Sequence, residues 1–171
     1  KQSLSSFEAL QRADHVGILL LMGGSNVPMV HYGFYTHTYF QIAYLCATGA
    51  VVLGAILALA HPLLKDRQSA RVWLFLRVTL VGWVQLTHDV VLRGGVMSLA
   101  GQEAIWTWVE TFGLYGLGLF FYLLKVPERL SPGTFDTLLH SHQVWHVFIV
   151  LGCVWHLKGC LTYAALAKFE I

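Results

Sequence analysis

Apolar runs long enough to cross a bilayer recur along the chain, near 14–35, 40–61, 72–92, 105–124 and 138–163. A transmembrane helix needs about 20 consecutive apolar residues. The polar outer stripe of a water-soluble helix is missing from stretches such as GLYGLGLFFYLL. Charged residues make up only 12% of the 171 residues, whereas soluble domains carry about 25%. The sequence therefore predicts an all-α, polytopic membrane bundle with five transmembrane helices, forming a single integral membrane domain over residues 1–171.

The charged residues bear on partners and on orientation. Net charge is only +2, and the basic residues are scattered beside the apolar runs, so we expect membrane lipids as partners and no nucleic acid. Seven basic residues belong to the N-terminal side of the membrane and three to the other side. Loops rich in Lys and Arg face the cytoplasm. We therefore expect a cytoplasmic N-terminal end and a C-terminal end that is outside or lumenal.

Four histidines occur in the apolar stretch LLHSHQVWHVFIVLGCVWHL, residues 138–157. Polar groups in such sequence are costly unless they are paired or bound to something. His142 and His146 are four positions apart, so on a helix they share a face and their rings can converge on one ion. His140 lies on nearly the opposite face. The pattern predicts a metal site, although two core histidines hydrogen-bonded to neighbouring helices would give the same spacing.

An acidic residue, Asp14, stands at the start of the first apolar run, on the same expected side as the two histidines. A carboxylate there could orient a ligand or accept a proton from water. The alternative is a solvated aspartate at the start of a helix. His88 and Asp89 stand near the other side, where structural pairing is the stronger interpretation.

Three stretches carry a resemblance to a known family. VPERLSPGTFDTLLHSHQVWHVFIVLGCVWHLKG (126–159) resembles the last part of the progestin and adipoQ receptor family, also called haemolysin-III-related proteins. RADHVGILLLMGGSNVPMVHYGFY (12–35) is similar to its third helix and FLRVTLVGWVQLTHDVVLRGG (75–95) to its fifth. The resemblance thus implies that the five expected helices correspond to helices three to seven of a seven-helix protein.

The resemblance also implies a metal and its ligands. Family members bind zinc through three histidines, of which two map to His142 and His146, while an aspartate near the metal maps to Asp14 as the catalytic residue. The third histidine belongs to an S-x-x-x-H motif in the family's second helix. No such motif precedes Asp14, so we expect this chain to lack the family's first two helices and the third ligand to lie upstream of it.

For function, the resemblance implies a zinc-containing membrane receptor or hydrolase similar to adiponectin receptors, hydrolysing a lipid amide such as ceramide. A lipid or a protein hormone would be its ligand. The alternative is a non-catalytic receptor, or a protein of zinc and lipid homeostasis, in which the metal only holds helices together. Both use the same ligands, so the sequence does not separate enzyme from receptor.

Overall fold

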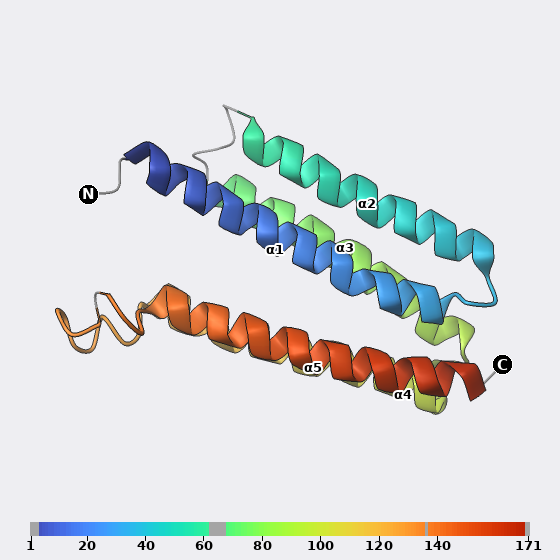
Figure 1. Cartoon of the computed structure of the whole chain (residues 1–171). Helices are drawn as coiled ribbons and strands as arrows, with labels where there is room; N and C mark the ends of the chain where they lie inside the picture. Colours follow the sequence, from blue (N-terminus) through green and yellow to red (C-terminus); the bar gives the residue numbers. More distant parts are fainter. Residues whose placement is uncertain (1–3, 62–67, 136, 170–171) are drawn as a thin grey trace. The chain divides into compact units, whose positions relative to one another are not determined.

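The computed structural model of the protein describes residues 4–61, 68–135 and 137–169, and Figure 1 shows its helices in chain order. Within these residues the chain forms five α-helices, one short 3₁₀ turn at Gly95–Met97 and no strand. The helices are α1 (Leu4–Gly33), α2 (Thr38–Ala60), α3 (Gln68–Leu92), α4 (Leu99–Leu124) and α5 (Ser141–Phe169). The predicted all-α architecture is confirmed.

Four of the five helices have the length and the apolar composition to cross a membrane, namely α2, α3 from Trp73 onward, α4 and α5 as far as Leu166. The first helix, α1, has 30 residues, which at 1.5 Å per residue is about 45 Å. Its composition is more mixed, because polar residues such as Ser25, Asn26 and His31 interrupt the apolar run. A membrane-crossing role for α1 therefore stays a prediction.

Two helices begin well before their predicted starts. The first helix begins at Leu4 instead of near Asp14, since the preceding residues EALQRA are good helix formers. Asp14 is thus ten residues into α1, and its placement at a helix start was wrong. The fourth helix begins at Leu99 instead of 105, because the Ser98 hydroxyl accepts a hydrogen bond from the Gly101 N–H at 2.9 Å and caps it.

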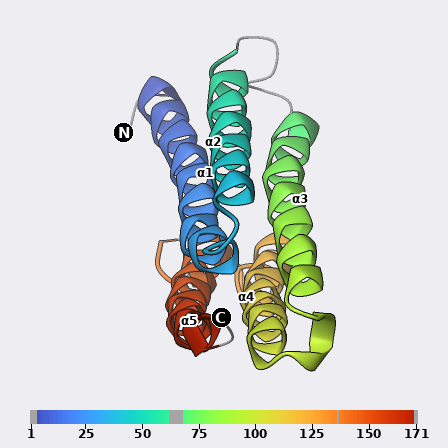
Figure 2. The ribbon, with the colours of Figure 1, turned by 90° about the vertical axis from the view of Figure 1, so that its right-hand side faces the viewer.

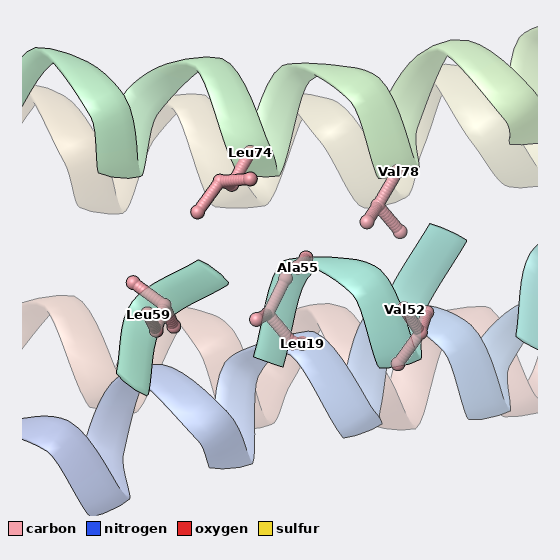
Figure 3. Close-up of a cluster of buried hydrophobic side chains, with 6 residues drawn as sticks. All are labelled: Leu19, Val52, Ala55, Leu59, Leu74 and Val78. Atoms are coloured by element: carbon pink, nitrogen blue, oxygen red, sulfur yellow. The ribbon is translucent and has the colours of Figure 1, made fainter. Parts of the chain in front are cut away.

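The described helices group into two compact units, with α1–α3 in residues 1–95 and α4 with α5 in residues 96–170. In the first unit the three helices lie side by side, as Figure 2 shows. Its core is a cluster of buried side chains, drawn in Figure 3, consisting of Leu19, Val52, Ala55, Leu59, Leu74 and Val78. Each helix of this unit contributes to the cluster, so apolar contact holds the three together.

In the second unit, α4 and α5 run side by side (Figure 2). Small residues let the two backbones approach closely: a Cβ at Gly118 would lie 2.7 Å from Phe148 Cβ, and Gly152 faces the ring of Tyr115. Such small-residue contacts are the usual means of helix packing in membranes. Polar contacts add to them, because the Trp155 indole donates to Glu110 Oε2 at 2.6 Å. Of these two helices, α5 carries the two predicted histidine ligands.

Candidate metal centre

The rings of His142 and His146 meet on one face of α5. Their Nε2 atoms are 2.9 Å apart and their ring centroids 4.7 Å apart, at an interplanar angle of 34°. Both side chains are half-buried. The predicted shared face follows directly from the helix, which begins at Ser141 and continues without interruption past His146.

One aromatic side chain of α4 packs against the His142 ring. The ring of Tyr122, near the end of α4, packs edge-on against it at a centroid distance of 5.5 Å, and Tyr122 also contacts Trp145 at 5.2 Å. The ring of His140 is farther away, at 6.3 Å from that of His142. Tyr122 therefore restricts the orientation of the His142 ring, while the His140 ring stays apart from the two converging Nε2 atoms.

The donor set of this histidine pair suits zinc. Imidazole nitrogens bind Zn²⁺ at about 2.0–2.1 Å in tetrahedral sites, which places two ligating nitrogens roughly 3.3 Å apart. The 2.9 Å between the two Nε2 atoms is close to that spacing. At this distance the Nε2–H of one ring can donate a hydrogen bond to the Nε2 of the other. A cation between the rings would require only a small outward movement of each ring.

The third predicted site residue, Asp14, lies on α1 in the first unit, whereas the two histidines lie on α5 in the second. The structure thus brings together His142 and His146, and the role of Asp14 beside them stays a prediction. The ring of the residue after Asp14, His15, contacts the Gln11 carbonyl oxygen through Nδ1 at 2.5 Å.

Two other histidines have structural partners within their own unit. His88 Nδ1 lies 2.8 Å from the Tyr44 hydroxyl, and its neighbour Asp89 accepts a hydrogen bond from Arg93 at 2.9 Å. His156 is buried on α5, with Nδ1 3.5 Å from the Thr111 hydroxyl. The first contact agrees with the predicted structural pairing at His88 and Asp89, and the second gives His156 a structural partner as well.

Sequence reasoning missed the residues that fix the start of α5. Ser141 is the first helical residue, and its hydroxyl donates to Glu128 Oε1 at 2.7 Å. Gln143 Oε1 accepts a hydrogen bond from the Leu139 N–H at 2.6 Å. A glutamine three residues after a helix N-cap is a known signal for such a contact. No comparable signal links Glu128 to Ser141, because thirteen positions separate them.

Comparisons with known proteins agree with the resemblance seen in the motifs. The model of the haemolysin-III related family matches residues 2–157. A heptahelical transmembrane protein of Oryza sativa subsp. japonica, ADIPOR2, is 37% identical over 147 residues, which are 84% of this chain and 62% of that protein. The progestin and adipoQ receptor family member 3 of Mus musculus is 34% identical, over 89% of this chain and 53% of its own length.

The adiponectin receptor protein of Drosophila melanogaster is 32% identical over 86% of this chain and 34% of its own length. The chain thus spans between about a third and three fifths of these three relatives. The family match covers nearly the whole chain, and it includes α5 as far as Leu157 with both converging histidines. The chain therefore belongs to the haemolysin-III-related family of multi-pass membrane proteins, together with progestin and adipoQ receptor and adiponectin receptor proteins.

Proposed function

We propose that the protein holds zinc through His142 and His146 and hydrolyses an amide bond in a membrane lipid, with ceramide as the substrate class. The observation that carries the proposal is the convergence of two half-buried imidazole Nε2 atoms at 2.9 Å on one turn of an otherwise apolar helix. A bound cation offsets the cost of placing such groups among apolar side chains.

When bound, zinc polarises a carbonyl group and lowers the pKa of a coordinated water toward about 7. The chain's own residues would hold the metal at the Nε2 atoms of His142 and His146, and the ring of Tyr122 packs against that of His142. The third protein ligand, as the resemblance implies, belongs to the family's second helix. Asp14 acts as the general base and accepts a proton at a carboxylate oxygen. The acyl chain reaches the site from the bilayer.

The test separates metal binding from hydrolysis. In the purified full protein, Asp14→Ala should leave zinc content nearly unchanged and reduce ceramide turnover by at least about 100-fold, since a positioned general base contributes roughly 10²–10⁴-fold. Turnover is measured in lipid vesicles, with Asp14→Asn as an isosteric control that should be equally inactive. Full turnover in both variants would remove Asp14 from the chemistry.

A receptor without catalysis is the alternative to hydrolysis. The fruit fly relative is an adiponectin receptor protein by name, and a metal tying helices together would need the same two histidines. In that case the wild-type protein should contain zinc and turn over no ceramide, and His146→Ala should lower thermal stability without any change in turnover.

A further inference from the structure

The first turn of α5 is hydrogen-bonded to the beginning of the chain segment that follows α4. The Ser141 hydroxyl donates a hydrogen bond to Glu128 Oε1 at 2.7 Å, and Ser141 itself is only 5% exposed. Glu128 belongs to the stretch between Leu124 and Ser141 that joins the two helices. The bond therefore connects this segment to the first helical residue, directly before His142.

Electrostatics favour a carboxylate at this position. The first N–H groups of a helix lack intrahelical partners, and the helix dipole attracts negative charge there. Desolvation raises the pKa of Glu128. Hydrogen bonds from its own N–H and from the hydroxyl and N–H of Ser141, together with the charge of His140, lower it by more, so the pKa of Glu128 is below its ordinary value. Glu128 is thus ionised at neutral pH and stabilises the start of α5.

A second contact fixes the same turn from the other side. Gln143 Oε1 accepts a hydrogen bond from the Leu139 N–H at 2.6 Å, and the amides of Gln143 and Val144 donate to the His140 carbonyl at 2.9 and 3.1 Å. Leu139 is in the left-handed region with φ 60°. The contact of Gln143 resembles a capping box, except that the N–H it accepts from belongs to Leu139, one residue before the N-cap position.

This turn determines where His142 lies relative to His146. Helix ends fray, and His142 is the second helical residue while His146 is one turn further in. We propose that Glu128 and Ser141 are positioning residues, which hold the first turn of α5 in place so that the His142 ring meets the His146 ring. The inference rests on the proposed metal role of this pair, and Glu128 acts on it through Ser141 and not as a ligand.

Variants of the two residues should weaken metal binding without removing a ligand. Outer residues that orient metal ligands typically contribute 10–100-fold to affinity, so Glu128→Ala and Ser141→Ala should each weaken zinc binding by about tenfold. Because the two substitutions remove the same hydrogen bond, the double variant should lose less zinc affinity than the two single variants lose combined. Glu128→Gln keeps an acceptor oxygen for the Ser141 hydroxyl and should lose less affinity than Glu128→Ala.

The experiment uses the full protein in detergent micelles, with cobalt(II) in place of zinc. Cobalt affinity is measured by competition with a chelator, and its visible absorption spectrum reports ligand geometry. Amide hydrogen exchange of the metal-free protein is measured at residues 142–146. Ser131→Ala is the control, because it removes a hydroxyl contact to Thr134 at 3.1 Å that lies within the same connecting segment.

The expected result is weaker cobalt binding, an altered spectrum and faster exchange at residues 142–146 in Glu128→Ala and Ser141→Ala, with Ser131→Ala like wild type. Unchanged affinity, spectrum and exchange in these two variants would overturn the positioning role. A wild-type protein that binds no cobalt would contradict the proposed function alone, and the exchange rates of the metal-free variants then decide whether Glu128 holds this turn. If Glu128→Ala does not fold, Glu128→Gln and Ser141→Ala give the same comparison.

Discussion

Glycine at a few positions sets how closely α4 and α5 approach each other. A Cβ added at Gly159 would lie 2.8 Å from the Cβ of Thr107, and Thr107 is almost completely buried. Real Cβ atoms do not approach each other so closely, so the helices or the Thr107 side chain would have to move. Gly113, on α4, has no atom within 4 Å of such a Cβ. The two positions therefore allow a matched comparison.

We expect Gly159→Ala to destabilise the protein by about 1–3 kcal/mol, the usual cost of overpacking. Gly113→Ala should be neutral or stabilising by up to about 1 kcal/mol, since alanine is the better helix former. Thermal unfolding in detergent, followed by circular dichroism, measures both. Equal stability of the two variants would contradict close packing of α4 against α5 at Thr107.

At the level of residues, the sequence predicted the shared face of His142 and His146, because a four-residue spacing on a helix leaves little choice. The 2.9 Å between their Nε2 atoms confirms that geometry, while the metal itself stays a prediction. Tyr122 and Glu128 could not be predicted, since their contacts with α5 depend on how the chain folds back between the two helices. Local periodicity carries no information on such contacts.

At the level of elements, α1 and α3 are joined near their C-terminal ends by one arginine. Arg93 donates to the carbonyl oxygens of Tyr32 and Gly33 at 2.9 and 3.0 Å, and its Nε donates to Asp89 Oδ1 at 2.9 Å. The Asp89 side chain is 5% exposed. Arg93 thus satisfies carbonyl groups at the end of α1 and also neutralises a buried carboxylate.

Arg93→Ala should lower the free energy of unfolding by roughly 3 kcal/mol, because it removes one partner of a buried ion pair. The control is Arg129→Ala, at an exposed arginine outside the membrane-crossing helices, which should change stability by less than about 0.5 kcal/mol. Chemical unfolding of the purified protein gives both values. A loss in Arg93→Ala as small as that of the control would show that the ion pair contributes nothing.

Hydrophobic run length predicted the existence of all five helices but not their starts. Polar yet strongly helix-forming residues precede Asp14, and Ser98 supplies a cap seven residues before the predicted start of α4. Hydropathy indicates where the apolar, membrane-compatible residues begin, whereas the helix begins where its first N–H groups find hydrogen-bond partners. The same distinction explains why α1 is helical over 30 residues although its composition is mixed.

At the scale of the whole molecule, the excess of basic residues on the N-terminal side predicts a cytoplasmic N-terminal end and a C-terminal end outside or in the lumen. Of the residues behind this prediction, Lys1, Lys65 and Arg67 lie outside the described residues. Tags on each end, digested by protease in sealed vesicles of known orientation, measure the arrangement. A C-terminal tag found on the cytoplasmic side of the membrane would contradict the predicted orientation.

The central claim is that His142 and His146 together hold a zinc ion, and the zinc content of purified full protein tests it most directly. His142→Ala and His146→Ala should each abolish stoichiometric zinc, because a site that loses one of its few protein ligands becomes open and weak. His140→Ala should retain it, since that ring stays apart from the converging Nε2 atoms. Zinc content equal to wild type in both His142→Ala and His146→Ala would contradict the account.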